Sequence, residues 1–302
     1  MLNQNQNIEV PFLHLSFLKD NKVDGVYYNS FLKYLETYPV VRNEHIHNFY
    51  TILLVTGGQG KITVNDATYE IKPKTICRIA PDQRHSYEGI YNADGNILFI
   101  CQDYYVEEFS FIRLLNVFSC TSQVNRNSCN PCIALSDKEF KSLSDLISSI
   151  SNEYDSYTPE NNAVSIMRSL LNILLLRLSD IHETKSDNSS TGSSIMIHEL
   201  SHLIDSSFVK EHHIKFYTSA LNISEKQLND LCNRYFNSSL KKILKDRLML
   251  EARKLLISSE MSVSEISYKL NYDDNSYINK VFRKEVGLTP KKFRDIHRKL
   301  VP

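Results

Sequence analysis

The segment that decides the fold is EISYKLNYDDNSYINKVFRKEVGLTP, residues Glu265 to Pro290. It contains two short runs with apolar residues three or four positions apart, separated by Leu270-Asn271-Tyr272. Ser262 precedes the first run, where a hydroxyl caps a helix, and Gly287 follows the second run, where glycine commonly ends one. Pro290 suits the first turn of a further helix. The segment therefore predicts two short helices joined by a tight turn.

The second helix of this pair has two chemically different sides. Its apolar side consists of Tyr277, Ile278, Val281 and Phe282. Its polar side consists of Asn275, Ser276, Asn279, Lys280 and Arg283. Amides, hydroxyls and cations read base edges and contact phosphates when a helix enters the major groove. The pattern predicts a helix-turn-helix, although a single unit of this kind also fits an ordinary solvent-exposed helix.

A second copy of the pattern, 50 residues earlier, favours the helix-turn-helix. The apolar positions Ile278, Val281, Phe282 and Val286 are matched by Leu228, Leu231, Cys232 and Phe236. The amide Asn229 matches Asn279, Arg234 matches Lys284, and Asn237 falls where Gly287 ends the later helix. Asparagine tolerates the left-handed conformation that this position requires.

The turn of the earlier copy, Leu221-Asn222-Ile223, matches Leu270-Asn271-Tyr272, and Ser224 is placed to cap the helix that follows. Between the copies, Leu240 to Ser259 predicts one long helix. Two reading helices on a rigid connector could enter successive major grooves, about 34 Å apart.

Residues 195–298 resemble the DNA-binding domain of the AraC-type transcriptional regulators. The family's second-unit signature is carried by Ala252, Leu255-Leu256, Val263, Glu265-Ile266, Ser276-Tyr277, Phe282-Arg283-Lys284, Gly287, Thr289-Pro290 and Phe293-Arg294. The sequence departs from the family at Ser267, where Ala is usual, and at Asn271-Tyr272, where Gly-Phe is usual. The resemblance implies a double helix-turn-helix domain that binds double-stranded DNA.

The resemblance also assigns the contact residues by position. The residues implied to read bases are Lys226, Asn229 and Asp230 in the first unit, and Asn275, Ser276, Asn279 and Lys280 in the second. The residues implied to contact phosphates are Arg234, Lys241, Arg283, Lys291 and Arg294. Phosphate contacts position a protein on DNA without specifying sequence. For each residue the alternative is an exposed polar side chain that does not touch DNA.

The region from about residue 40 to 102 predicts an all-β fold, because β-forming runs alternate with closely spaced turn signals. These signals are Gly57-Gly58, Asn65-Asp66, Pro81-Asp82 and Asp94-Gly95. The segment from Glu44 to Gly89 resembles the small cupin barrel that many AraC-type regulators carry as a sensor domain. The resemblance rests on His45-Ile46-His47, on the Gly58 to Gly60 turn and on the Pro81 to His85 segment.

Metal-dependent cupins use two histidines, a nearby glutamate and a later histidine as ligands. Here His45, His47 and His85 supply three imidazoles, but residues 48–60 contain no carboxylate. We therefore expect no catalytic metal, no cofactor and no enzymatic activity, with the histidines at a solvated rim or in a polar pocket. The residues expected to line an effector pocket are His45, His47, Tyr50, Arg78 and His85. A metal-dependent cupin enzyme and a constitutive DNA binder with an empty barrel remain the alternatives.

Composition bounds the remaining possibilities. The chain has 302 residues, of which 42% are hydrophobic and 23% charged, as expected for a globular protein of two domains. Residues 195–302 hold 19 Lys and Arg against 13 Asp and Glu, a net of +6; since each total is 35, the preceding residues hold 16 against 22, a net of −6. A basic module attached to an acidic one favours an anionic partner for the former. We expect no membrane segment, and six cysteines without a signal peptide predict reduced thiols and a cytoplasmic protein.

The cysteines also form a short motif. Cys129 and Cys132 have the spacing of a redox pair, and Cys120 lies nearby, but a lone pair of this kind is weak evidence for zinc or for a redox site. We expect ordinary loop cysteines, with a thiol switch as the alternative.

Between the β region and the basic module, helical periodicity predicts one helix after Ser136 and a second from Glu160 to Ile181. The leucines from Leu171 to Leu178 suit packing against a second copy, and the family implies a homodimer; the alternative is that both helices pack on their own barrel. The expected domains are residues 1–135 for the cupin-like sensor, 136–183 for dimerisation, 184–194 for a Ser/Gly linker and 195–302 for DNA binding.

The sequence thus predicts an α+β multidomain protein, with an N-terminal cupin-like β-barrel, two following helices and a C-terminal all-α double helix-turn-helix domain. The implied function is that of a sequence-specific transcriptional regulator. Its implied partners are double-stranded DNA, RNA polymerase, a second copy of the chain and a small-molecule effector, for which a sugar is one candidate. The effector, the operator and the choice between activation and repression are not encoded in any of these patterns.

Overall fold

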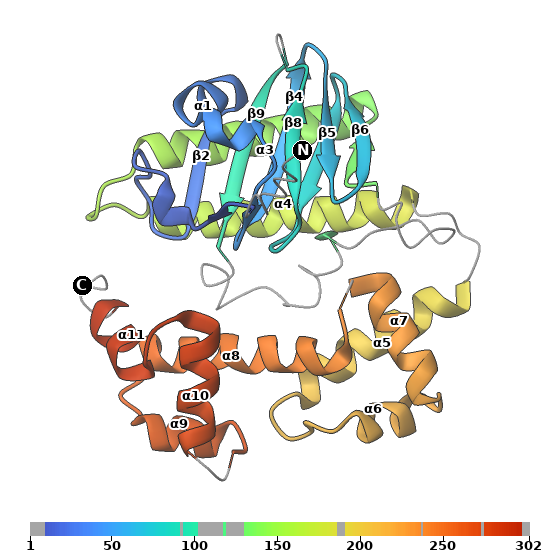
Figure 1. Ribbon diagram of the computed structural model, residues 1–302, viewed down its shortest axis with the longest axis vertical. Coiled ribbons are helices and arrows are strands. Elements are labelled where there is room, and N and C mark those ends of the chain that lie inside the picture. The colour runs from blue at the N-terminus through green and yellow to red at the C-terminus, as the bar shows by residue number, and fades with distance from the viewer. Residues whose placement is uncertain are drawn as a thin grey trace, which may run out of the picture. The chain divides into compact units, whose positions relative to one another are not determined.

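The computed structural model describes residues 10–90, 93–101, 117–118, 130–185, 191–236, 238–272 and 275–297. These residues belong to two compact units, an N-terminal one and a C-terminal one, which divide at residue 186 (Figure 1). Val117 and Phe118 group with the second unit, whereas the sequence placed them in the first. No described helix is long and apolar enough to cross a membrane.

The first unit is built on two main antiparallel sheets. The strands are β1 (Phe12–Leu13), β2 (Val26–Ser30), β3 (Ile46–His47), β4 (Tyr50–Gly57), β5 (Gly60–Val64), β6 (Ala67–Ile71), β7 (Thr75–Ile79), β8 (His85–Glu88), β9 (Asp94–Ile100) and β10 (Cys132–Ala134). One sheet has the order β10-β7-β4-β9-β2 and the other the order β6-β5-β8, while β1 and β3 form a short parallel pair. The expected cupin-like fold is therefore present as two sheets. In the described residues, strand hydrogen bonds do not join these sheets into one closed barrel.

Strand β4 is buried on both of its faces, because each face covers a different layer. Leu53 and Val55 point into the core between the sheets, together with Ile62 of β5 and Tyr87 of β8. Residues at alternate positions of a strand point to opposite faces, so Ile52 and Leu54 face the other way. The near-continuous apolar run in β4 therefore reflects a central strand between two packed layers.

The first unit also contains helices. They are α1 (Phe31–Thr37), α3 (Asp137–Asp155) and α4 (Ala163–Lys185), with short 3-10 turns at η1 (Leu15–Phe17) and η2 (Pro39–Arg42). Ser136 and Glu139 form a capping box at the start of α3. The second helix starts at Ala163 and not at Glu160, because the Asn161 side chain accepts a hydrogen bond from the Ala163 backbone N–H at 3.1 Å.

Turn chemistry was predicted correctly at three of four positions. Gly58, Asn65 and Asp82 all have positive φ, the conformation that glycine, asparagine and aspartate tolerate best. Asp94-Gly95 is not a turn: both residues lie in β9. A Cβ on Gly95 would lie 2.3 Å from the Leu54 carbonyl oxygen, so this glycine permits β9 to approach β4 closely.

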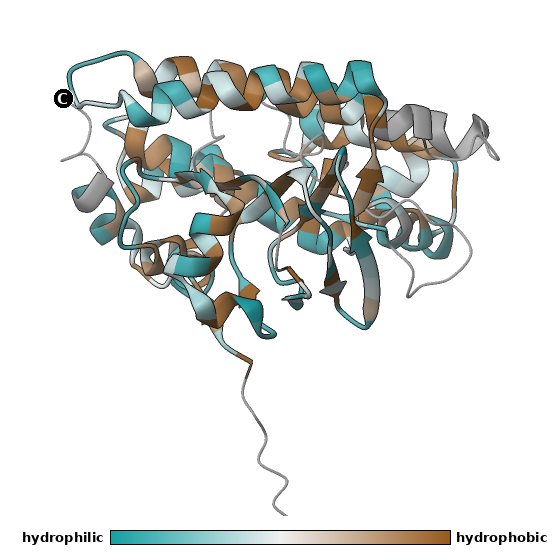
Figure 2. Ribbon diagram, turned by 90° about the horizontal axis from the view of Figure 1, so that it is seen from above, coloured by the Kyte–Doolittle hydropathy of each residue, from teal (hydrophilic) through white to brown (hydrophobic). Residues whose placement is uncertain are grey.

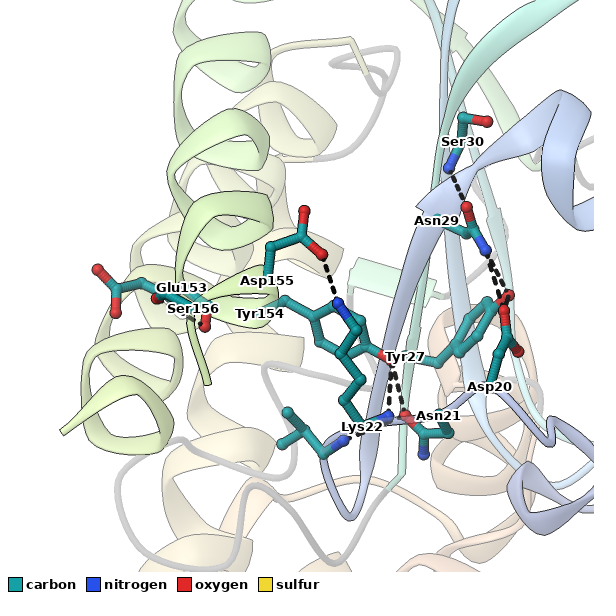
Figure 3. Close-up of polar contacts among 11 residues, drawn as sticks. Asp20, Asn21, Lys22, Tyr27, Asn29, Ser30, Glu153, Tyr154, Asp155 and Ser156 are labelled. Atoms are coloured by element: carbon teal, nitrogen blue, oxygen red, sulfur yellow. Dashed lines mark hydrogen bonds and ion pairs between the residues drawn. The ribbon is translucent and has the colours of Figure 1, made fainter. Parts of the chain in front are cut away.

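The end of α3 is fastened to the start of the sheet by polar contacts (Figure 3). Lys22 Nζ lies 2.7 Å from an Asp155 carboxylate oxygen. The Tyr154 hydroxyl donates to Asn21 at 2.9 Å and accepts from the Lys22 backbone N–H at 3.1 Å. The α3 helix is thus anchored to its own sheet.

The leucines of α4 are also buried within the subunit. Leu171, Leu174, Leu175 and Leu178 are at most 1% exposed. They therefore cannot be the surface that packs against a second copy, which corrects that part of the sequence interpretation. The hydrophobic residues of α4 that remain exposed are Ile166 and Ile173, two turns apart.

The second unit is all α-helical, as predicted. Its helices are α5 (Thr191–Ser207), α6 (Ile214–Leu221), α7 (Glu225–Phe236), α8 (Leu240–Ser258), α9 (Val263–Lys269), α10 (Asn275–Val286) and α11 (Pro290–His297). Along the long helices in Figure 2, hydrophobic and hydrophilic residues interleave, as expected for amphipathic segments. One continuous core runs through the unit, from Leu200 of α5 through Leu248 of α8 to Phe293 of α11.

The expected linker is shorter than 184–194. Helix α4 continues to Lys185 and α5 begins at Thr191, and the residues between these two helices, 186–190, lie outside the described part of the chain. A Ser/Gly-rich composition does not prevent helix extension when the neighbouring residues are good helix formers.

Candidate nucleic-acid interface

The second helix-turn-helix consists of α9 and α10. Ser262 and Glu265 form a capping box at the start of α9, and Asn271 takes a left-handed conformation in the turn, with φ at 60°. Ile278 and Phe282 of α10 are buried, and Phe282 packs edge-on against Phe293 with ring centroids 5.3 Å apart. Gly287 has a φ of 77°, as predicted for the residue that ends this helix.

The opposite side of α10 is exposed. Ser276, Asn279, Lys280 and Arg283 all lie there. A shallow depression beside the helix is lined by Asn279, Lys280, Arg283, Lys284 and Thr289. Asn275 is the first residue of α10, but its side chain lies outside the described part. The amphipathic pattern therefore placed this face correctly, and the burial of Ile278 and Phe282 fixes its orientation.

Lys284 and Thr289 line this depression but were not among the predicted contact residues. Lys284 had a usable signal, because it matches Arg234 in the earlier copy. No sequence pattern marked Thr289 as a contact residue. Its hydroxyl accepts a hydrogen bond from the Lys292 N–H at 3.3 Å and so caps α11.

The first helix-turn-helix, α6 and α7, repeats this geometry. Asn222 is left-handed with φ at 53°, and Ser224 and Gln227 cap α7 through reciprocal hydrogen bonds. Leu228 and Cys232 are buried, which turns Lys226 and Asp230 outward, with Asn229 half-buried. The side chain of Arg234 and all of Asn237 lie outside the described part. This face mixes one cation with one carboxylate, unlike that of α10.

Among the expected phosphate contacts, Lys241, Arg283 and Lys291 are exposed. Arg294 is different. Its Nε donates to the Leu256 carbonyl at 3.0 Å, and its guanidinium also donates to the Met261 carbonyl. The last carbonyls of a helix lack partners within the helix, so Arg294 completes the end of α8. We therefore assign Arg294 a structural role in place of the expected phosphate contact.

The connector α8 holds both units. Lys245 of α8 pairs with Glu285 of α10 at 2.7 Å. Arg247 of α8 pairs with Asp205 of α5 at 3.9 Å and lies over the Phe208 ring, 4.0 Å from its centroid. With 19 residues, α8 is about 28 Å long. That length suits two helices that enter successive major grooves.

In the first unit, the three predicted histidines form a buried cluster. His45, His47 and His85 are each at most 2% exposed, so they do not lie at a solvated rim. The ring of His85 lies 4.0 Å from that of His45 and 4.7 Å from that of His47, measured between centroids. The reason is strand pairing: His45 and His85 exchange two backbone hydrogen bonds of 3.0 Å.

Hydrogen bonds fix the tautomers of two of these rings. His45 Nδ1 lies 2.9 Å from the Asn43 carbonyl and His85 Nδ1 lies 3.1 Å from the Gln83 carbonyl. A carbonyl only accepts, so both Nδ1 atoms carry the proton and both Nε2 atoms keep a lone pair. His47 Nε2 lies 3.2 Å from the Thr51 hydroxyl, and His47 Nδ1 is buried without a hydrogen-bond partner.

Burial keeps these imidazoles uncharged. It lowers the pKa of His47 to about 3, with repulsion from His45 adding to the effect. Burial also lowers the pKa of His85 well below its ordinary value, as does proximity to His47 and His45. It lowers the pKa of His45 as well. The cluster therefore presents neutral hydrogen-bond acceptors at physiological pH.

The other two expected pocket residues lie on a different face. Arg78 pairs with Ile52 and Cys77 with Leu53 across β4 and β7. Leu53 and Cys77 point into the core between the sheets, so Arg78 points to the opposite face. Tyr50 lies on that face as well, by the same alternation along β4. The five residues therefore do not line one cavity, because strand alternation separates them.

No group of three or more histidine, cysteine or acidic side chains in the described part of the chain is placed to hold a metal ion. The absence of a catalytic metal at the histidines stays a prediction from sequence.

Two of the cysteines are not the reduced loop thiols that the sequence indicated. Cys77 of β7 and Cys132 of β10 stand directly opposite each other in the sheet, with Cα atoms 4.1 Å apart, and form a disulfide. Cys120 and Cys129 lie outside the described residues. The spacing of Cys129 and Cys132 did not indicate Cys77 as a partner, because Cys77 is 55 residues from Cys132 in the sequence.

Comparison with known proteins supports both halves of this description. A model of the AraC-like ligand binding domain matches residues 32–94, and a model of a helix-turn-helix domain matches residues 217–296. The transcriptional activator RhaR of Cronobacter sakazakii is 24% identical over 255 residues, covering 83% of this chain and 86% of that protein. RhaR of Escherichia coli K12 is 22% identical over 255 residues, covering 84% and 87%.

Solved structures give weaker likenesses. ToxT of Vibrio cholerae is 12% identical, covers 90% of this chain and 98% of its own, and has a TM-score of 0.38. The DNA-binding domain of AdpA in complex with target DNA is 18% identical, covers 35% and 95%, and has a TM-score of 0.33. At these scores the superpositions add nothing to the assignment made from the sequence matches.

Proposed function

The chain belongs to the AraC-type family of transcriptional regulators, and on that premise we propose that it binds a single operator with both of its helix-turn-helix units. Helices α7 and α10 enter successive major grooves, with α8 as the spacer. The observation that carries the proposal is the repeat of one geometry, a left-handed Asn in the turn followed by a helix with an outward polar face, on both sides of a single long helix.

Within that arrangement, α10 is the main reader of sequence. Asn279 has the amide that pairs with adenine, and Lys280 and Ser276 extend the same face. Asn275 takes part from the first position of the helix. In the first helix-turn-helix, Lys226, Asn229 and Asp230 read fewer base positions. The carboxylate of Asp230 suits only a hydrogen-bond donor such as the cytosine amino group. Lys241, Arg283, Lys291 and Arg234 contact phosphates, and Lys284 joins them from the edge of the depression.

The N-terminal unit binds the effector. We place the site at the cluster of His45, His47 and His85, which supplies neutral acceptors suited to a ligand rich in hydroxyl groups, such as a sugar. Effector binding alters the presentation of the DNA-binding units, so the two binding free energies are coupled. The matched relatives are activators, which favours activation through RNA polymerase.

We propose no catalytic role, since the matched relatives are regulators, and a cytoplasmic location, because that is where a bacterial-type regulator meets DNA. Dimerisation uses the outward side of α4, where Ile166 and Ile173 are 42% and 43% exposed.

The test is to sequence the DNA fragments that the purified chain retains from a pool of random duplexes, with and without candidate sugars. The proposal expects one enriched motif with two blocks, and a change in enrichment with the right sugar. An Asn279→Ala variant should lose one block, whereas the matched control Lys269→Ala, on exposed α9 surface, should keep both. Absence of any enriched motif would overturn the proposal, and a motif unaffected by every sugar would favour a constitutive binder.

A further inference from the structure

Apart from the shared connector, the turn of the second helix-turn-helix contacts the loop that leads into the first. The Asn271 side-chain amide, in the turn of the second unit, donates to the Lys210 backbone carbonyl at 3.1 Å. Lys210 lies in the loop between α5 and α6, directly before the first helix-turn-helix. The two residues are 61 positions apart in sequence. The contact therefore links the turn of the second helix-turn-helix to the entrance of the first.

A second contact lies beside the first. The ring of Tyr272 packs against the ring of His212 with centroids 4.9 Å apart. Burial lowers the pKa of His212, so the imidazole is neutral and suited to packing against an aromatic ring. We call Lys210, His212, Asn271 and Tyr272 together the bridge.

The turn of the first helix-turn-helix provides an internal comparison for Asn271. Asn222 stands at the turn position that corresponds to Asn271, and both are left-handed, with φ of 53° and 60°. The backbone requirement is therefore the same at the two positions. Of the two asparagine side chains, both in the described part of the chain, only that of Asn271 donates a hydrogen bond to a residue outside its own helix-turn-helix. The amide of Asn271 thus has a role that left-handed geometry alone does not explain.

A single connecting helix fixes the distance between two modules better than their rotation about its axis. A second contact away from that axis closes a ring of contacts and restrains the rotation. The distinction matters on DNA, where one added base pair shifts a groove by about 3.4 Å along the axis and rotates it by about 34°, at 10.5 base pairs per turn. A restrained pair of reading helices can follow only one spacing of half-sites.

We propose that Asn271 and Tyr272 are positioning residues that fix α7 and α10 at one relative placement, and so set the spacing of half-sites that the protein accepts. The inference rests on the proposed function, because it requires both units on one operator. The bridge residues are not among those proposed to contact DNA. It contributes to specificity by rejecting operators of the wrong length.

The experiment measures binding of the full chain to three duplexes: the operator recovered by selection, and the same operator with one base pair inserted or removed between its two blocks. The variants are Asn271→Gly, which keeps the left-handed turn but removes the amide, Tyr272→Ala, and the two together. The matched controls are Asn222→Gly at the equivalent turn and Tyr268→Ala, whose ring is 83% exposed on α9. Tyr272→Phe keeps the ring.

For the wild type we expect at least about tenfold weaker binding to each altered spacing, the size of one poor base-pair contact. In the double variant this ratio should fall to about two- or threefold, while both controls and Tyr272→Phe keep the wild-type ratio. The ratio compares duplexes for the same protein, so a loss of folded protein does not change it. Denaturant unfolding of each variant verifies that it is folded.

Wild-type spacing ratios in the double variant would overturn the inference, as would an equal relaxation in Asn222→Gly. A wild type that binds no operator specifically would instead contradict the proposed function, so the two failures are distinguishable.

Discussion

The two units of this chain handle polar side chains in opposite ways. In the DNA-binding unit the polar residues that matter lie on the outside: Asn279, Lys280 and Arg283 cover one face of α10, above a core formed by Ile278 and Phe282. In the sensor unit they lie inside, where three histidines pack against one another away from solvent. An outward polar face can meet a large, charged partner, and an inward one can meet only something small.

The largest expected effect is a loss of folding stability at low pH, and it follows from the burial of the histidines. His47 is neutral in the folded state, with a pKa of about 3, against about 6.5 when unfolded. Between these values the unfolded chain binds the extra proton, so stability is fully present above pH 6.5 and is lost as the pH falls. The slope is about 1.4 kcal/mol per pH unit for each such histidine. Several kcal/mol should therefore be lost by about pH 4.

Urea unfolding at pH 7.5 and pH 5 tests this contrast in the wild type and in two variants. His47→Phe removes the titration and keeps a flat ring against Phe49, so its stability should depend less on pH. The matched control is His202→Gln, an exposed histidine of the second unit, which should behave like the wild type. If His47→Phe retained the full pH dependence, the buried cluster would not be what distinguishes the two units.

The next largest effect is on the stability of the DNA-binding unit and concerns Arg294. Its side chain is directed to backbone carbonyls of its own unit and not to the outward polar face. Removing its side chain leaves the Leu256 and Met261 carbonyls without their donor. We expect Arg294→Ala to lower the free energy of unfolding by about 1–3 kcal/mol. Lys291→Ala, on the exposed side of the same helix, should change it by less than about 0.5 kcal/mol. Equal small changes in both would return Arg294 to the list of phosphate contacts.

Arg294 and the histidines show which features local sequence patterns could not predict. Helical periodicity, caps and the 50-residue repeat predicted α6 to α11 and the outward face of α10, because those properties are local. Whether Arg294 points to DNA or to the end of α8 depends on where residues some forty positions away fold. The same holds for the His45–His85 pairing and for the Cys77–Cys132 disulfide, each of which joins distant segments. Strand alternation, likewise, assigned Tyr50 and Arg78 to a face only once the register was known.

A comparison within the DNA-binding unit comes next in size. Asn279→Ala should weaken binding to the selected operator by about 1–3 kcal/mol and leave binding to random DNA nearly unchanged. Asn229→Ala, the equivalent change on α7, should cost less, because Asn229 is only half exposed and has Asp230 beside it. Equal losses on specific and random DNA would make Asn279 a positioning residue.

The smallest effect is in the response to salt. Arg283→Ala and Lys291→Ala should each flatten the slope of log affinity against log salt concentration by about one unit, because each removes one phosphate contact. Lys254→Ala, on α8, serves as the control and should leave the slope unchanged. Unchanged slopes for Arg283 and Lys291 would mean that the basic excess of this unit serves a partner other than DNA.

The most direct measurement is hydroxyl-radical footprinting of the full chain on its selected operator. If α7 and α10 read successive major grooves of one duplex, each bound chain should protect two blocks whose centres lie about 10 base pairs apart. In Asn279→Ala one block should weaken and the other persist. A single protected block per chain, lost as a whole in that variant, would contradict the account, since only one of the two units would then be on the DNA.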